Sequence, residues 1–112
     1  MKECIFCRII RGEIPANIIY ESEEALAFDD VNPMAPVHVV VVPKTHVATL
    51  MDISGGDTMK GLTAAVQEVA RIKGIDRKGF RTVINCNEDG GQVIFHLHVH
   101  ILGGRKLNDD MG

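Results

Sequence analysis

The order of apolar and polar positions predicts several short strands and one long helix. Two apolar runs, residues 18–20 and 25–28, flank an acidic turn and predict two strands. A dense β-branched run between two prolines, residues 37–42, predicts a buried strand. Two later runs, residues 80–86 and 93–102, predict two more strands.

Apolar side chains spaced three and four apart predict a helix over residues 57–73. Asp57 is the candidate N-cap, and Gly74 supplies the stop. Residues 5–10 are apolar and fit either a first helical turn or a strand. Strands on both sides of one helix predict an α+β domain with a mainly antiparallel sheet of about five strands.

Composition and charge narrow the class of protein. A chain of 112 residues has room for a single domain, residues 1–112, and its 46% apolar and 24% charged residues exclude a disordered chain. A net charge of −3 argues against a basic groove for nucleic acid, although a small phosphorylated ligand stays possible. No apolar run approaches the ~20 residues of a membrane span, and no signal peptide or disulfide framework is evident. We therefore expect a cytoplasmic protein without a membrane partner.

Three histidines carry the strongest chemical signal. His96, His98 and His100 alternate with apolar residues, so on a strand they share one face about 7 Å apart while Leu97 and Val99 enter a core. A purely structural role is a poor explanation, because three aligned imidazoles repel one another when protonated and lose solvation when buried. The remaining interpretations are metal binding, strained at this spacing, and nucleophilic catalysis through a covalent histidine intermediate.

A glycine pair directly precedes the histidines. Gly90 and Gly91 allow backbone N–H groups to approach a ligand closely, and such groups form anion-binding concavities. A glycine pair alone is weak support, since most such pairs are only turns. Next to three aligned histidines, it predicts a phosphate site where imidazoles and N–H groups stabilise a transferring phosphoryl group.

Residues 91–100, GQVIFHLHVH, resemble the signature of the histidine triad (HIT) family. Further stretches resemble the Hint-like branch of histidine triad nucleotide-binding proteins, and together they cover nearly the whole chain. These stretches are residues 4–15 (CIFCRIIRGEIP), 27–33 (AFDDVNP), 35–38 (APVH), 43–46 (PKTH) and 102–105 (LGGR).

The resemblance implies a fold and an activity. The fold is HIT-like, with a short N-terminal helix besides the long one, and the protein is a homodimer. The activity is hydrolysis of purine nucleoside phosphoramidates, of the adenosine 5'-phosphoramidate class, with release of an amine and a nucleoside monophosphate. Within the triad His96, His98 and His100, the middle residue His98 is the nucleophile, His100 assists near the phosphate, and His38 extends the hydrogen-bond relay. That cycle requires no metal.

The resemblance also implies a set of nucleotide-binding residues. Asp30 matches the carboxylate that binds the ribose hydroxyls, and Asn85 matches an asparagine near the phosphate, where the glycine loop contributes Gly91, Gln92 and Val93. The resemblance also implies an apolar wall around the base, made of Phe6, Ile9, Ile14, Phe28 and Val31. From their composition alone, these five residues could equally well be ordinary core residues.

The Cys4-x-x-Cys7 pair fits a different role. From its spacing alone, a terminal C-x-x-C is a zinc site, a redox pair or neither. The resemblance to bacterial HIT proteins implies a structural zinc held by Cys4, Cys7, His46 and His96, a composition that zinc favours in closed sites. His96 would then tie the N-terminus to the catalytic strand.

Two departures from the family pattern leave alternatives open. Many relatives have Ser where this chain has Val93, so a side-chain hydroxyl near the phosphate is absent, although the Val93 N–H could serve. The tail, residues 106–112, is polar, which leaves the preference for the amine open. The alternatives are a nucleotide-binding regulatory module with little turnover and a metal-dependent hydrolase that uses the histidine row.

Overall fold

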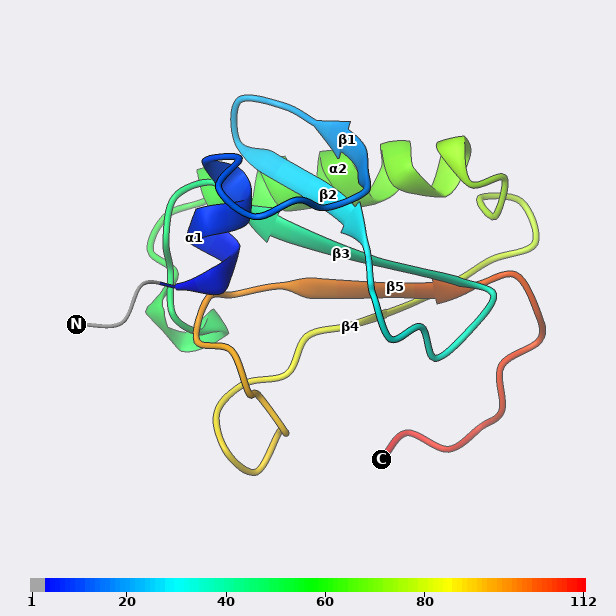
Figure 1. Cartoon of the computed structure of the whole chain (residues 1–112). Coiled ribbons are helices and arrows are strands. Elements are labelled where there is room, and N and C mark those ends of the chain that lie inside the picture. Colours follow the sequence, from blue (N-terminus) through cyan, green and yellow to red (C-terminus); the bar gives the residue numbers. More distant parts are fainter. Residues whose placement is uncertain (1–3) are drawn as a thin grey trace.

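An antiparallel sheet of five strands carries one helix on each face in the computed structural model, which describes residues 4–112 (Figure 1). The strand order is β1-β2-β3-β5-β4, and every neighbouring pair is antiparallel. This arrangement confirms the predicted α+β class. The elements are α1 (Ile5–Ile10), β1 (Ile18–Glu21), β2 (Ala25–Asp29), β3 (Val37–Pro43), α2 (Asp57–Ile72), β4 (Arg81–Val83) and β5 (Val99–Gly103).

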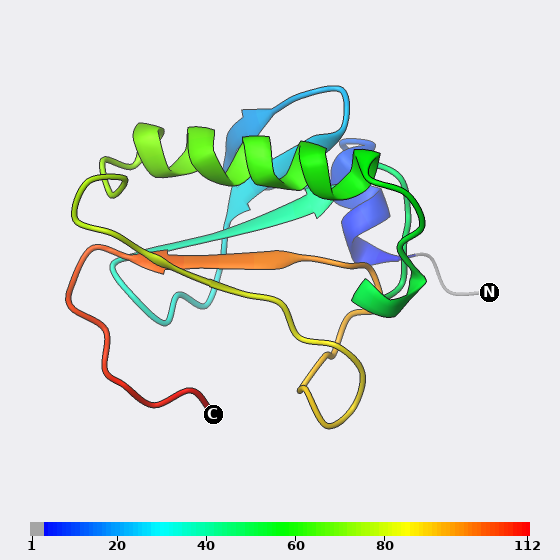
Figure 2. The same ribbon diagram turned by 180° about the vertical axis from the view of Figure 1, so that it is seen from behind.

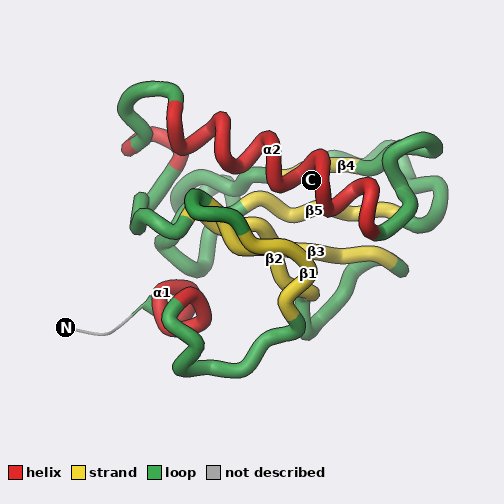
Figure 3. Tube along the Cα trace, turned by 90° about the horizontal axis from the view of Figure 1, so that it is seen from above, coloured by secondary structure: helices red, strands yellow, loops and turns green. Residues whose placement is uncertain are grey.

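Each face of the sheet has its own apolar cluster. On β3, Val39 and Val41 pack in the cluster that contains the buried side chains of α2, whereas Val40 and Val42 pack with Phe6 of α1. The two helices therefore lie on opposite faces, as the view from above shows (Figure 3). A central strand covered on both faces loses its polar positions, which explains the unbroken valine run.

The long helix α2 crosses the back of the sheet (Figure 2). Its N-cap is Gly56 without a side-chain cap bond, so the prediction that Asp57 is the N-cap was wrong by one residue. The predicted stop at Gly74 is confirmed. Gly74 has φ +70°, and the N–H of Ile75 reaches back to the carbonyl of Ala70 at 2.9 Å, which forms a Schellman motif.

The last two strands are shorter than the sequence predicts: β4 is Arg81–Val83 and β5 is Val99–Gly103. The ladder between β3 and β5 ends at the pair Val41–Val99, although β3 itself continues to Pro43. The N–H of Leu97 instead donates to the carbonyl of Val47 at 2.6 Å. The alternation of faces persists regardless: Leu97 is fully buried on the α2 side, while the rings of His96 and His98 contact Phe6 of α1.

The segment between β3 and α2 contains a 3₁₀ helix, η1 (Leu50–Asp52), that the sequence analysis did not predict. Thr49 closes it with a capping box, in which its hydroxyl accepts from Met51 N–H and Asp52 accepts from Thr49 N–H. Within residues 4–112, no helix combines the length and the apolar character that a bilayer crossing requires.

Candidate active site and metal centre

A cleft of about 740 Å³ opens on the face of the sheet that carries α1. Its walls come from α1 and the loop after it, the ends of β2 and β3, and the segment before β5. The cleft brings together nine of the ten residues that the sequence analysis assigned to nucleotide binding: Phe6, Ile9, Ile14, Phe28, Asp30, Val31, Asn85, Gly91 and Val93. Gln92 does not line it.

Three histidines line the polar side of this cleft. His38, on β3, places its Nε2 2.9 Å from Nδ1 of His100 on β5. The rings of His98 and His100 lie 5.0 Å apart between centroids, closer than the spacing along an ideal strand. The sequence-predicted relay from His98 to His100 and His38 is therefore contiguous in space.

Backbone partners fix where the protons of this relay sit. The N–H of Met34 lies 3.0 Å from Nδ1 of His38, and because an amide N–H only donates, Nδ1 accepts. The proton of neutral His38 is then on Nε2, which donates to Nδ1 of His100. His100 consequently carries its own proton on Nε2. The sequence gives no signal for the Met34 contact.

The same reasoning assigns His98. Its Nδ1 lies 2.8 Å from the carbonyl oxygen of His96, which only accepts, so Nδ1 carries the proton. In the neutral imidazole, the lone pair is then on Nε2. The side chain is 8% exposed, and Phe6 packs edge-on against its ring with centroids 5.1 Å apart. An imidazole oriented in this way can act as a nucleophile through Nε2.

Burial and the neighbouring histidines favour the neutral form of His100. Burial lowers the pKa of His100 below its ordinary 6.5, the neighbouring His98 and His38 lower it further, and Asp30 opposes them. A neutral His100 retains the lone pair that accepts from His38. Asp30 sits beside this pair, with one oxygen accepting from the N–H of Asn32 at 2.8 Å and the other 3.4 Å from Nε2 of His38.

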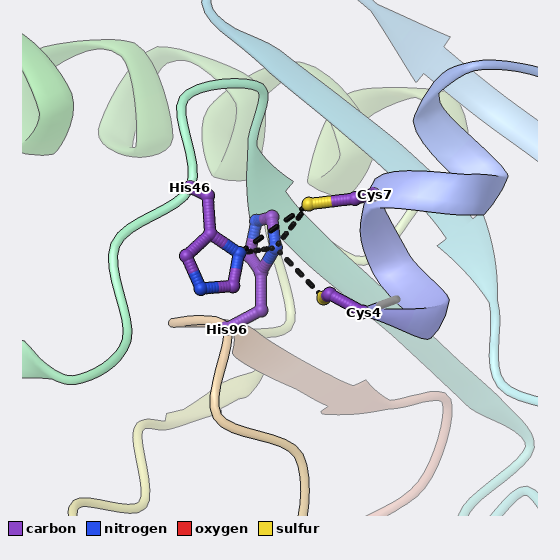
Figure 4. A group of neighbouring side chains, drawn as sticks. All are labelled: Cys4, Cys7, His46 and His96. Atoms are coloured by element: carbon purple, nitrogen blue, oxygen red, sulfur yellow. Dashed lines mark hydrogen bonds between the residues drawn. The ribbon is translucent and has the colours of Figure 1, made fainter. Parts of the chain in front are cut away.

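A second cluster joins the N-terminus to the segment before β5 (Figure 4). Cys4 and Cys7, at α1, face His46 from the loop after β3 and His96. The Nδ1 atom of His96 lies 3.3 Å from Sγ of Cys4, 3.6 Å from Sγ of Cys7 and 3.1 Å from Nδ1 of His46. The fold thus brings all four predicted metal ligands together.

The donor set of this cluster fits zinc. His96 directs Nε2 at the carbonyl of Pro43 at 2.8 Å, so its proton is on Nε2 and the Nδ1 lone pair points at the sulfurs. Burial lowers the pKa of His96, with the nearby His46 and His98 lowering it further, which favours the neutral form that a metal needs. A tetrahedral zinc holds its ligand atoms about 3.3–3.8 Å apart, close to the separations found here.

A second trio, Asp30, His38 and His100, also converges within 4.8 Å. The positions of the imidazole protons in this trio argue against a bound metal ion. Nε2 of His38, the atom that would have to ligate, carries the proton because Nδ1 is occupied by the N–H of Met34. The trio is therefore a hydrogen-bond relay, and the histidine row divides between two sites: His96 belongs to the cysteine cluster, and His98 and His100 belong to the cleft.

Contrary to the expectation from the sequence, the glycine loop does not leave all of its backbone N–H groups free to bind a ligand. The N–H of Gly91 is already bonded to the carbonyl of Glu88 at 2.9 Å, and that of Gln92 to the carbonyl of Asn87 at 3.0 Å. The Val93 N–H has no hydrogen-bond partner within residues 4–112, and Val93 lines the cleft. The Val93 N–H is therefore available to a ligand, whereas those of Gly91 and Gln92 are used within the loop.

This arrangement defines a histidine triad protein, and comparison with known proteins agrees. The family model described as "HIT domain" matches residues 11–107, so the chain belongs to the HIT domain family. It is 37% identical over 108 residues to a purine nucleoside phosphoramidase of Escherichia coli (strain K12), with 95% of this chain and 91% of that protein covered.

Solved structures of the family have the same fold. A histidine triad protein from Clostridium difficile superposes with a TM-score of 0.92 at 46% identity, covering 98% of this chain and 99% of that one. A HIT family hydrolase from Legionella pneumophila Philadelphia 1 superposes with a TM-score of 0.93 at 38% identity, covering 98% and 100%. The HIT-like fold expected from the sequence is confirmed.

Proposed function

We propose that this protein is a nucleotide-binding hydrolase that cleaves the P–N bond of purine nucleoside phosphoramidates, of the adenosine 5'-phosphoramidate class. The observation that carries the proposal is the bond from Nδ1 of His98 to the carbonyl of His96, which leaves a nucleophilic Nε2 at an apolar cleft. The similarity to an E. coli protein named purine nucleoside phosphoramidase supports the choice of substrate.

The cleft suits a nucleoside monophosphate unit. Aromatic and aliphatic side chains, Phe6, Ile9 and Phe28 among them, offer the flat apolar surfaces that a purine needs. Asp30 stands at the edge of this wall as the acceptor for ribose hydroxyls. Asn85 and Val93 line the same cleft as His98, and we assign Asn85 and the Val93 N–H to the phosphate.

The proposed reaction has two steps. Nε2 of His98 attacks phosphorus, a bond forms between histidine and the nucleotide, and the P–N bond to the amine breaks. The amine leaves with a proton supplied from the relay, in which His100 presents its Nε2–H and His38 donates to it. In the second step the oxygen of water bonds to phosphorus and the histidine–phosphorus bond breaks. The proton of that water returns to the relay, and the nucleoside monophosphate and free His98 are released.

We further propose that Cys4, Cys7, His46 and His96 hold a structural zinc. Four protein ligands complete a tetrahedron and leave no open position for water or substrate, as in closed structural sites. Bound zinc would supply a crosslink between α1 and the segment before β5. The chemistry of P–N cleavage stays with the histidines of the cleft.

A homodimer is the assembly we propose. β4 is last in the strand order, so its outer edge has no strand partner among the described residues. Phe80, next to this edge, is 37% exposed. A second copy would cover both, and light scattering of the purified protein would give twice the chain mass; a monomeric mass at micromolar concentration would refute it.

The alternative is a nucleotide-binding module with little turnover, favoured by the absence of a hydroxyl at Val93. The deciding experiment measures hydrolysis of a fluorogenic adenosine phosphoramidate by the wild type and by His98→Ala, both shown to be folded. Turnover that the variant loses and a chelator spares supports the hydrolase. Equal negligible rates with retained AMP binding support the module, and loss of activity on chelation with the fold intact supports metal-dependent hydrolysis.

A further inference from the structure

The side chain of Gln92 is committed to the protein backbone. It is 6% exposed and lies outside the cleft lining. Its Oε1 accepts from the N–H of Asn87 at 2.9 Å, and its Nε2 donates to the carbonyls of Ala48 at 2.8 Å and Ile94 at 3.1 Å. Both amide hydrogens and the amide oxygen are thus used by three separate stretches of chain.

These bonds close the glycine loop on itself. Gln92 also donates its own N–H to the carbonyl of Asn87 at 3.0 Å, so the two residues are joined by a reciprocal pair of hydrogen bonds. Asn87 has φ +62°, a left-handed conformation that asparagine tolerates better than most residues. The loop is therefore closed before any ligand arrives.

The hydrogen bonds of the Gln92 amide hold the backbone on both sides of Val93. Asn87, in the loop that leads to Val93, and Ile94, the residue after it, are both bonded to the Gln92 amide. The third bond, to Ala48, anchors the loop to the chain that follows β3. Val93 lines the cleft with its N–H unpartnered, while its side chain is 87% exposed and free of packing constraints. The backbone geometry at Val93 consequently depends on the Gln92 amide.

We propose that Gln92 is a positioning residue that aims the main-chain N–H of Val93 at a phosphoryl oxygen of the nucleotide. The inference rests on the proposed function, because it assumes that the cleft takes a nucleoside monophosphate. It reassigns Gln92 from nucleotide contact to support of the contact. The position of the Val93 N–H matters more in this chain because the side chain of residue 93 has no hydroxyl that could also bind the phosphate.

The test compares AMP with adenosine, which probes the base and ribose wall without the phosphate. Gln92→Met keeps the side-chain volume and removes all three polar bonds. We expect calorimetry to give an AMP affinity about tenfold weaker than the wild type, the effect of one misaligned hydrogen bond to a charged group. The adenosine affinity should stay within about twofold of the wild type.

Thr49→Val is the matched control. Thr49 is also buried, lies next to Ala48, and its hydroxyl likewise bonds backbone, but it serves the cap of η1 rather than the glycine loop. Like Gln92→Met, the control should lower the melting temperature. Unlike Gln92→Met, it should leave the affinities for both AMP and adenosine unchanged. If Gln92→Met weakens adenosine and AMP equally, its role is only structural and the proposal is overturned.

Two further outcomes are informative. Unchanged AMP affinity in Gln92→Met overturns the proposal, whereas a wild type that binds neither ligand overturns the proposed function instead. Amide NMR of the ligand-free proteins separates positioning from direct contact. Positioning requires the Val93 amide resonance of Gln92→Met to shift in the absence of nucleotide, and an unshifted Val93 amide with weakened AMP binding would assign the side chain itself to the phosphate.

Discussion

The imidazole Nδ1 of His98 donates to the carbonyl of His96 at 2.8 Å. His96 therefore serves both the cysteine cluster and the cleft, through different atoms. The side chain of His96 faces Cys4 and Cys7, and its main chain orients the candidate nucleophile. Phe6, between the two cysteines in sequence, contacts both imidazole rings. The cysteine cluster and the cleft are therefore mechanically connected, and a change in one should be measurable in the other.

Loss of the metal should weaken nucleotide binding. We expect Cys7→Ser to bind zinc poorly and to bind AMP at least about fivefold more weakly than the zinc-loaded wild type, the lower end of typical coupling between sites. Linkage requires that AMP tighten zinc binding by the same factor. Calorimetric titrations of each ligand with and without the other measure both numbers.

Cys86→Ser is the matched control for that experiment, because Cys86 lies outside the cluster and the cleft lining. It should leave zinc stoichiometry and AMP affinity unchanged. Equal AMP affinity in zinc-loaded and zinc-free wild type would show that the cluster holds α1 in place without influencing the cleft.

Phe6 should contribute to both stability and binding. Its ring is buried between Phe28 and the two histidines, so Phe6→Ala removes a core aromatic and should cost about 3–5 kcal/mol of unfolding free energy. Phe6→Leu should recover most of the stability but not the flat surface for the base. Urea unfolding and AMP titration of the two variants test this, and AMP affinity of Phe6→Leu equal to the wild type would exclude Phe6 from the base wall.

Asp30 should recognise the ribose. Asp30→Asn keeps an oxygen for the N–H of Asn32 but removes the charge, and it should weaken AMP by about 1.5–3 kcal/mol while leaving 2',3'-dideoxy-AMP nearly unaffected. The control is Asp29→Asn, because Asp29 also borders the cleft but is paired with Asn17 and Lys73. A loss in Asp30→Asn that is equal for both nucleotides would place the role of Asp30 in the relay with His38 instead.

The sequence predicted the parts of this fold that rest on local patterns. Valines 39–42, the helix stop at Gly74 and the burial of Leu97 follow from periodicity and glycine chemistry. The ends of β4 and β5 could not be predicted, because strand ends depend on contacts between segments distant in sequence, such as the bond from Leu97 to Val47.

The site shows the same division between local and long-range information. Residue types and spacing identified the histidines and the cysteine pair. Which proton sits on which nitrogen depends on backbone groups distant in sequence, such as the carbonyl of Pro43 at His96, or hidden in a turn, such as the N–H of Met34 at His38. The commitment of Gln92 to Asn87, Ala48 and Ile94 has no sequence signal either.

The pH dependence of stability should reveal the lowered pKa of His100. Burial, His98 and His38 hold the pKa of His100 below the 6.5 that it has in an unfolded chain, against the opposing effect of Asp30. As the pH falls through 6.5, the unfolded state takes up a proton that the folded state does not, so the unfolding free energy decreases until the pH reaches the lower folded-state pKa. The pKa of His96 is shifted in the same direction, so the wild type alone does not isolate His100. Urea unfolding at about pH 7.5 and about pH 5.5 should therefore be compared with His100→Gln, which should lose less stability on acidification; an equal loss in both proteins would assign the pH dependence to other groups.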